Sequence, residues 1–396
     1  MSGEPGTSSG PNTPQLHRKG RNRGALYGVI AVVVVVVVVV AVGAAAGWFS
    51  SGSGNKTGNC SAGLKGAGST LVAPLMFDWA TQYAAVSSNY GTVNYQSVGS
   101  GAGINDIAAK TVDFGASDAP LNPTQTSAAP GLVTIPESAG AVVPIYNLPG
   151  VGSLDFTGAL LAQIYLGQIT NWNNSVLQGL NPTAHLPTAT IGVVHRADGS
   201  GTTFIWTSFL SLESSQWASQ VGRGTAVVWP TGTAESGNAG IAGYVKNAPD
   251  SLGYVDLNYA LTTGGVTAGL VQNPSGHFIY ATVNDTASAI KDANPTLPAG
   301  TASWYNVSVL NAPGATDYPI SSLTYVFVYQ NLNGAYSTYS QTQADSLVNW
   351  IHWILTVGQS YSAQLYYVPL PANIIAADLT TLASITFNGQ APTMCT

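Results

Sequence analysis

Three short segments of this chain place glycines and hydroxyl residues where an apolar run ends and a helix-forming run begins. They are GAGSTLVAP at 66–74, SVGSGAGIND at 97–106 and RADGSGTTF at 196–204. The first amides of a helix have no partner within it and carry partial positive charge, so such a turn can hold an anion. Ordinary helix capping by Ser or Thr explains any one of the turns. Three in one chain favour a shared anion site, because a tetrahedral anion accepts from several donors at once.

Arg196 is the expected charged donor of this site. It is one of only two arginines beyond residue 49, and it follows the apolar run IGVV. A guanidinium offers a planar fork of donors that matches two oxygens of one anion. Asp198, two residues later, is expected to hold the guanidinium in position. An ion pair on the surface is the alternative interpretation of Arg196.

Asp118 ends the run DFGASD, at the end of an expected buried strand. A carboxylate next to an anion is repelled unless the ligand carries a proton that the carboxylate can accept. Hydrogen phosphate has such a proton and fully ionised sulfate has none, so Asp118 would select phosphate. The alternative is that Asp118 caps a turn before Pro120.

The chain is poor in charge, which limits the classes of partner. Charged residues make up 7% of it, against about 25% in an average soluble protein. Beyond residue 23 there are seven basic residues and 16 acidic ones. Nucleic acid is therefore not expected as a partner, because binding its backbone needs many Lys and Arg side chains. An anion held by neutral dipoles needs little formal positive charge on the protein.

The N-terminal region predicts export. Residues 1–23 form a basic tail that we expect to be disordered and cytoplasmic, and residues 24–49 contain no charge. That length suits a single membrane-spanning helix, with the rest of the chain outside the cell. A cleaved signal peptide is the alternative. Residues 50–63 have the composition of a flexible linker.

Two cysteines, Cys60 and Cys395, lie near opposite ends of the exported part. Outside the cell such a pair usually forms a disulfide, which suits a fold whose ends lie close together. Two unrelated free thiols are the alternative.

Beyond the linker, strand-like and helix-like segments alternate, which predicts an α/β fold with parallel-rich sheets. Ligands of such folds bind where the strands end and the helices begin. The expected strands are 92–98, 112–117, 140–148, 190–196, 252–256 and 323–330, and the expected helices are 71–86, 101–111, 154–167, 202–212, 344–357 and 371–385.

These segments resemble the extracytoplasmic phosphate-binding proteins of phosphate-specific ABC transporters. GAGSTLVAPL, VNYQSVGSGAGINDIAAKTVDFGASDAPL, VVHRADGSGTTFIWTSFL and GNAGIAGYVKNAPDSLGYVD match family motifs in family order. The resemblance implies a two-lobed periplasmic-binding-protein fold of type II, with 64–143 plus 321–391 as lobe 1 and 144–320 as lobe 2. It also implies a monomer that binds inorganic phosphate between the lobes and docks on a membrane permease driven by a cytoplasmic ATPase.

The resemblance also implies the residues that bind the ligand. Leu71 stands where the family often has Phe, but a backbone donor survives that change. His195 stands where the family often has a second Arg, and it is expected to neighbour the ligand without contacting it. The matching positions are Thr70, Leu71, Ser100, Asp118, Arg196, Ser200, Gly201 and Thr202, with Asp198 supporting Arg196.

Two other functions stay open. A phosphate sensor or scavenger without a transporter fits the same residues. A phosphate-ester hydrolase could use Ser200 as nucleophile and His195 as base, but DGSGT is not a G-x-S-x-G turn and GAGST lacks the lysine of a P-loop. No Cys/His spacing suggests a metal site. We therefore expect a binding protein, not an enzyme, with no metal or cofactor.

Overall fold

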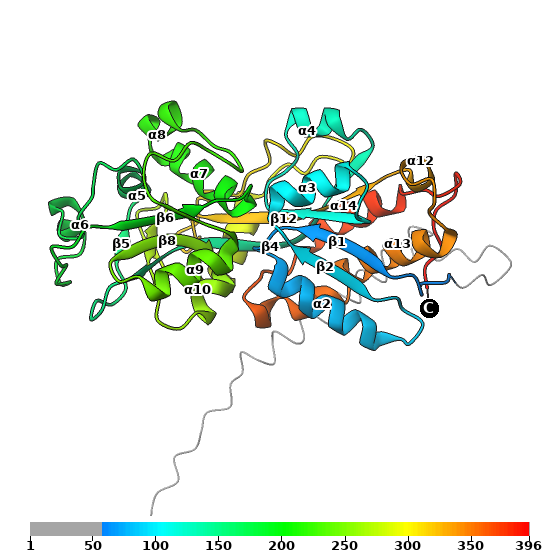
Figure 1. Cartoon of the computed structure of the whole chain (residues 1–396), viewed down its shortest axis with the longest axis horizontal. Coiled ribbons are helices and arrows are strands. Elements are labelled where there is room, and N and C mark those ends of the chain that lie inside the picture. The colour runs from blue at the N-terminus through cyan, green and yellow to red at the C-terminus, as the bar shows by residue number, and fades with distance from the viewer. Residues whose placement is uncertain (1–57, 396) are drawn as a thin grey trace, which may run out of the picture. The chain divides into compact units, whose positions relative to one another are not determined.

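The computed structural model describes residues 58–395. The expected tail, the expected membrane helix and residues 50–57 of the linker lie outside this range. Within residues 58–395, no helix is both long and apolar enough to cross a bilayer. This part of the chain places helices on both sides of a mixed sheet, in the α/β arrangement that the sequence predicts (Figure 1).

The first three strands lie in one half of the sheet. β1 (Leu64–Gly68) pairs in parallel with β2 (Val93–Ser97) on one side and β3 (Phe114–Ser117) on the other. Helices α2 (Ala73–Val86) and α3 (Ser100–Ala108) connect these strands in turn. Because parallel strands end at one edge of a sheet, the turns after β1, β2 and β3 lie close together.

Two long strands connect this half to the second half. The first part of β4 (Leu132–Asn147), up to Ala141, pairs antiparallel to β12 (Ser321–Tyr329). From Val142 onward, β4 pairs antiparallel to β8 (Ser251–Asp256). The chain therefore passes between the halves on adjacent, hydrogen-bonded strands (Figure 1).

The second half repeats the strand–helix pattern. β8 pairs in parallel with β6 (Gly192–Arg196), and β6 with β7 (Thr233–Glu235). α7 (Gly201–Glu213) follows β6, and α9 (Gly237–Asn247) follows β7. The other elements are α4 (Pro123–Ala128), β5 (Asp155–Phe156), α5 (Gly158–Tyr165), α6 (Ser175–Leu180), α8 (Ser215–Gln220), α10 (Leu257–Thr262), β9 (Thr267–Ala268), β10 (Leu270–Gln272), β11 (Phe278–Ile279), α11 (Val283–Ala293), α12 (Leu332–Ala335), α13 (Gln341–Leu355), two 3-10 turns (Gly358–Tyr361 and Ala363–Leu365) and α14 (Ala372–Ala383).

Each half of the sheet has an aromatic core of its own. In the first half, Tyr83 packs edge-on against Trp350, with ring centroids 5.1 Å apart. In the second half, Trp206 stacks on Tyr254 at 5.0 Å. All four side chains are at most 1% exposed. Two separate cores allow the halves to move against each other without unpacking either one.

The expected elements are largely confirmed, with two corrections. The range 154–167 is not one helix: β5 comes first, and α5 begins after Thr157, whose side chain accepts from the Leu160 amide at 3.1 Å. The strand expected at 140–148 begins at Leu132. Pro136 and Glu137 interrupt the apolar pattern there, but pairing with β12 keeps the strand intact.

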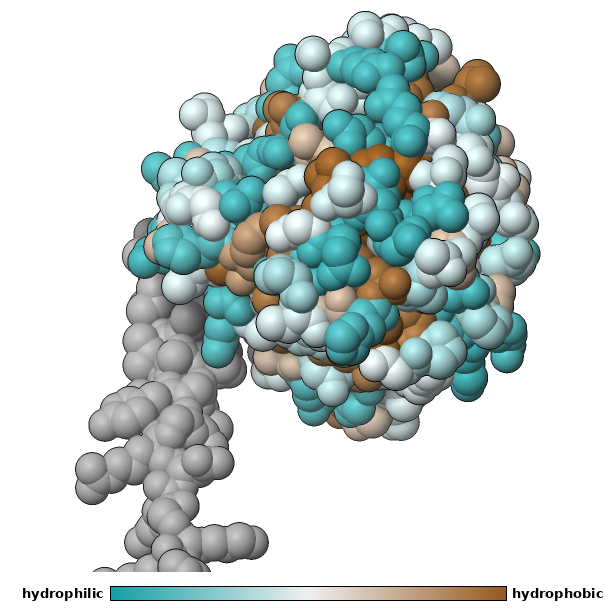
Figure 2. Space-filling model, turned by 90° about the vertical axis from the view of Figure 1, so that its left-hand side faces the viewer, coloured by the Kyte–Doolittle hydropathy of each residue, from teal (hydrophilic) through white to brown (hydrophobic). Residues whose placement is uncertain are grey.

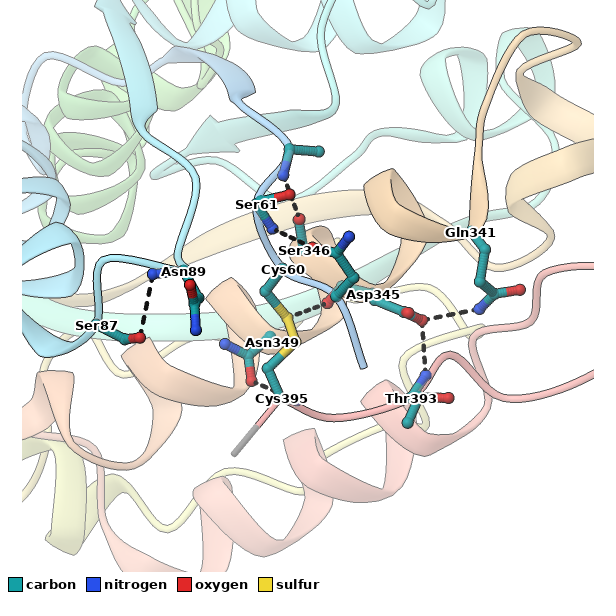
Figure 3. The surroundings of a disulfide bond; sticks show 12 residues. Cys60, Ser61, Ser87, Asn89, Gln341, Asp345, Ser346, Asn349, Thr393 and Cys395 are labelled. Atoms are coloured by element: carbon teal, nitrogen blue, oxygen red, sulfur yellow. Dashed lines mark hydrogen bonds between the residues drawn. A yellow bond between two sulfur atoms is a disulfide. The ribbon is translucent and has the colours of Figure 1, made fainter. Parts of the chain in front are cut away.

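A disulfide joins Cys60 to Cys395, with Cα atoms 6.1 Å apart, as the sequence predicts. Both ends of the described chain also bind the polar side of α13 (Figure 3). Ser346 accepts from the amide of Ala62 at 3.1 Å, and Asn349 accepts from the amide of Cys395 at 3.4 Å. The disulfide thus joins the two ends of the described chain to each other, and hydrogen bonds hold both ends against α13.

The surface is polar without being highly charged. Figure 2 shows the end of the molecule that carries α5 and α6, where apolar residues are interspersed with hydrophilic and near-neutral ones. This agrees with a chain in which 7% of residues are charged.

Replacing both cysteines by serine should lower the free energy of unfolding by about 2–4 kcal/mol, because the cross-link closes a very long loop in the unfolded chain. Urea denaturation of the purified variant, compared with the wild type before and after reduction, measures this. If reduction leaves the wild-type midpoint unchanged, the disulfide does not stabilise the fold.

Candidate functional site

The three glycine-rich turns of the sequence meet at one place. A Cβ placed on Gly201, the first residue of α7, would lie 2.6 Å from both Asp118 Oδ2 and Ser100 Oγ. The amide of Gly101 donates to the carbonyl of Gly199 at 2.8 Å. Residues from both halves of the sheet are thus in direct contact.

The side chain of Asn238, in α9, connects two more of the predicted residues. Its Nδ2 donates to Thr70 Oγ1 at 3.0 Å and to Thr202 Oγ1 at 3.1 Å. Its amide also donates to Thr70 Oγ1, at 3.2 Å. Thr70 and Thr202 are 7% and 0% exposed, so this cluster is shielded from solvent.

Four backbone amides at this place are free to donate. Within residues 58–395, the amides of Thr70, Ser100, Gly201 and Thr202 have no oxygen partner. Ser100 begins α3 and Gly201 begins α7, so two helix N-termini contribute. Such amides form a site for an anion, because unpaired donors carry partial positive charge.

Asp118 lies among these donors and is 1% exposed. Ser69 Oγ donates to its Oδ1 at 2.5 Å, and its Oδ2 has no partner within the described residues. Burial raises the pKa of Asp118 to about 6, although the hydrogen bond from Ser69 and the charge of Arg196 act in the opposite direction. At neutral pH Asp118 Oδ2 is therefore a buried acceptor without a hydrogen-bond donor.

Arg196 is buried at the end of β6 and is 3% exposed. Its Nε donates to Asp198 Oδ1 at 2.8 Å, and its Nη2 donates to the other oxygen of Asp198. Its Nη1 points to Thr202 Oγ1 at 3.4 Å. Burial raises the pKa of Asp198, but the bonds from Arg196 and from the Gly237 amide outweigh it, and the net shift is downward. Asp198 is therefore ionised and accepts two hydrogen bonds from the guanidinium.

Two predicted residues have partners of their own. The amide of Leu71 donates to Ser69 Oγ at 3.0 Å. Ser200 caps α7: its hydroxyl oxygen accepts from the Thr203 amide at 3.1 Å, and its own amide donates to Thr225 at 2.8 Å. Only the hydroxyl proton of Ser200 is left for a ligand.

Ser69, Asn238 and Tyr254 are part of the site but escaped the sequence reasoning. Tyr254 Oη accepts from the Arg196 amide at 3.3 Å and bonds Thr203 Oγ1 at 2.7 Å. Asn238 lies in the first turn of the glycine-rich helix α9, within the segment GNAGIAGYV, and this place in the sequence is a usable signal. Ser69 was inside a quoted turn, but nothing in the sequence tells which hydroxyl of Ser69 and Thr70 faces Asp118.

His195 is not positioned as a base for Ser200. Its ring stacks on Trp229 with centroids 4.7 Å apart, and its Nδ1 lies 3.2 Å from the Arg196 carbonyl oxygen. Burial lowers the pKa of His195, so the imidazole is neutral at pH 7. Within residues 58–395, no group of three or more His, Cys, Asp or Glu side chains could hold a metal ion.

A cavity of about 230 Å³ borders Asp118. Phe204, Tyr305 and Tyr325 line it, together with serines of α7 and β12. Asp118 is the only one of the predicted ligand residues on its wall.

Known proteins resemble this chain in sequence over most of its length. A family model described as a PBP superfamily domain matches residues 50–357. Phosphate-binding protein PstS of Xylella fastidiosa strain 9a5c is 38% identical over 317 residues, which cover 80% of this chain and 83% of that protein. The PstS of Haemophilus influenzae is 38% identical over 79% of this chain and 90% of its own length.

A solved structure shares the fold. The phosphate binding protein of Stenotrophomonas maltophilia superposes with a TM-score of 0.58 at 20% identity and covers 84% of this chain and 96% of its own.

Gly201→Ala should weaken oxyanion binding at least about tenfold, roughly 1.4 kcal/mol. The added methyl group would lie 2.6 Å from Asp118 and Ser100 and hold the two halves apart. Calorimetric titration with phosphate measures the effect.

Gly243→Ala is the matched control, because a Cβ at that position in α9 meets nothing within 4 Å. Equal affinity of the Gly201→Ala and Gly243→Ala proteins would show that the contact at Gly201 is not part of the anion site.

Proposed function

Because this chain belongs to the phosphate-binding proteins of the PBP superfamily, we propose that it captures inorganic phosphate outside the cytoplasm for an ABC importer. One observation carries the proposal: the free, buried Oδ2 of Asp118 lies within a cluster of unpaired amides. The amides attract an anion, whereas the carboxylate repels any anion that has no proton to donate to it. Hydrogen phosphate meets both requirements.

We propose that seven of the eight predicted residues, all except Leu71, bind phosphate with divided roles. The amides of Thr70, Ser100, Gly201 and Thr202 donate to ligand oxygens, and the hydroxyl protons of this cluster add to them. The Arg196 edge that faces Thr202 supplies the charged donor. Asp118 accepts the proton of the ligand. Leu71 contributes by packing next to Thr70, since its amide already has a partner.

The lobes are proposed as 64–143 plus 321–391 and 144–320. The change of partner in β4 after Ala141 and the start of β12 at Ser321 support these boundaries. Phosphate can accept hydrogen bonds from both lobes at once only when the lobes are closed. It therefore binds the closed form more tightly than the open form and shifts the population toward it. The closed form would then dock on the permease, whose ATPase drives uptake.

The uncharged segment 24–49 supports a retained membrane anchor with the basic tail in the cytoplasm. The binding domain would then act as a tethered monomer. Mass spectrometry of the protein from membranes, compared with the secreted fraction, distinguishes an anchor from a cleaved signal peptide.

Arg196→Ala should weaken phosphate binding by about 2–4 kcal/mol, because it removes a buried, charge-assisted donor and leaves Asp198 unpaired. Calorimetry at neutral pH tests this, and micromolar or tighter binding by the wild type is itself the test of the proposed function.

Arg223→Ala is the matched control for Arg196→Ala. Arg223 is exposed and lies over Tyr305, 4.8 Å from the ring centroid. The assignment of Arg196 fails if both variants bind phosphate as the wild type does.

Asp118→Asn should narrow the difference in affinity between phosphate and sulfate, because the amide no longer repels a fully ionised anion. In the wild type the same difference should shrink as the pH falls through about 6, where Asp118 becomes protonated. Competition titrations at several pH values measure both effects. Discrimination that is unchanged in Asp118→Asn would reject the role of this carboxylate.

A further inference from the structure

A second carboxyl group, that of Glu137, is buried and interacts electrostatically with Asp118. Glu137 is 0% exposed and lies in β4, where a register shift between Thr324 and Tyr325 of β12 leaves it as an extra residue. Its Oε1 and Thr324 Oγ1 are 3.0 Å apart, and its Oε2 has no partner within residues 58–395. The bulge thus directs an acidic side chain into the protein interior.

No basic group balances this carboxyl. Among the described residues the only ion pair joins Arg196 to Asp198. Burial raises the pKa of Glu137 to about 8, with hydrogen bonding from Thr324 opposing and the charge of Asp118 adding to the rise. Other titratable side chains lie on neighbouring elements. Tyr95 interacts with the carboxyls of Glu137 and Asp118. Three more interact with Asp118: Asp256, Tyr325 and Tyr367. Asp378 comes from α14, which packs on β4. Each of these Asp and Tyr side chains is either neutral or negatively charged, so none can balance the charge of Glu137.

Thr324 connects the two carboxyls. It bonds Glu137 Oε1, and its neighbour Tyr325 pairs with Ser117 of the antiparallel strand β3, which places Thr324 beside Asp118 in the sheet. A hydroxyl group has one proton to donate but can also accept. If Glu137 donates its acid proton to Thr324 Oγ1, the Thr324 proton is free for Asp118. If Glu137 is ionised, Thr324 donates to Glu137 instead, and Asp118 loses that support.

We propose that Glu137 is held as the neutral acid and, through Thr324, keeps Asp118 an ionised acceptor for the ligand proton. Glu137 is thus a positioning residue that sets the specificity of the phosphate site, and this role rests on the proposed function. Loss of its proton would place a second negative charge beside the anion and turn the Thr324 hydroxyl away from Asp118. Binding should then weaken at alkaline pH beyond the change caused by the ionisation of phosphate itself.

The test compares the full-length wild type with Glu137→Gln, which cannot ionise but keeps a donor at the same place. Phosphate affinity is measured by calorimetry between about pH 6.5 and pH 9.5, which brackets the titration of the raised carboxyl. At neutral pH the two proteins should bind equally. Across the range the wild type should lose about tenfold more affinity than Glu137→Gln, as expected for a buried like charge nearby.

Two further variants separate the role from a merely structural one. Glu137→Leu and Thr324→Val remove the donor chain, and both should bind phosphate more weakly at neutral pH and discriminate less against sulfate. Infrared spectroscopy of the ligand-free wild type should show the carbonyl band of a buried neutral acid that Glu137→Gln lacks. This last measurement needs no binding, and circular dichroism checks that the Glu137→Gln protein used for the comparison is folded.

The inference is overturned if the pH profiles of wild type and Glu137→Gln are parallel, or if Glu137→Gln loses binding at neutral pH. It is also overturned if Thr324→Val discriminates as the wild type does, or if the acid band is the same in wild type and folded Glu137→Gln. A wild type that binds no phosphate at any pH would instead overturn the proposed function.

Discussion

The buried guanidinium of Arg196 is bound along one edge by Asp198, and the rest of the site depends on this pairing. The pair is close to neutral, so the pocket has little net positive charge with which to attract an anion. Asp118 adds a negative charge to it. Attraction must therefore come from oriented amides and hydroxyls, which act strongly in a dry interior because they need no reorganisation there. A site built in this way can distinguish anions by their protons, whereas one dominated by charge would hold any anion of suitable size.

The fold supplies these dipoles by bringing strand ends and helix starts from two lobes to one place. Gly101 donates to Gly199 across the lobes, and Thr70 accepts from Asn238. Separation of the lobes would break these contacts but would leave the aromatic core of each lobe packed. The lobes can therefore separate at the strands that join them without exposing either core, which is what a capture mechanism by population shift requires.

Much of the candidate site could be predicted from the sequence, because its main parts are local. A glycine-hydroxyl turn before a helix creates free amides wherever it occurs, and Arg196 and Asp198 are two residues apart. The remaining parts depend on tertiary register. That Ser69 bonds Asp118, that Asn238 bridges Thr70 and Thr202, and that a bulge turns Glu137 inward all follow from strand pairing that no short segment encodes. The same limit explains the strand that was expected from residue 140 but begins at Leu132. Pro136 and Glu137 break the apolar pattern of residues 132–139, although pairing with β12 stabilises this segment as a strand.

The most direct measurement is neutron diffraction from crystals grown with phosphate. The account predicts one ion between the lobes, with a hydrogen atom between a ligand oxygen and Asp118 Oδ2. The other ligand oxygens should meet the amides of Thr70, Ser100, Gly201 and Thr202. A phosphate bound elsewhere, or one that turns only unprotonated oxygens toward a protonated Asp118, would contradict it.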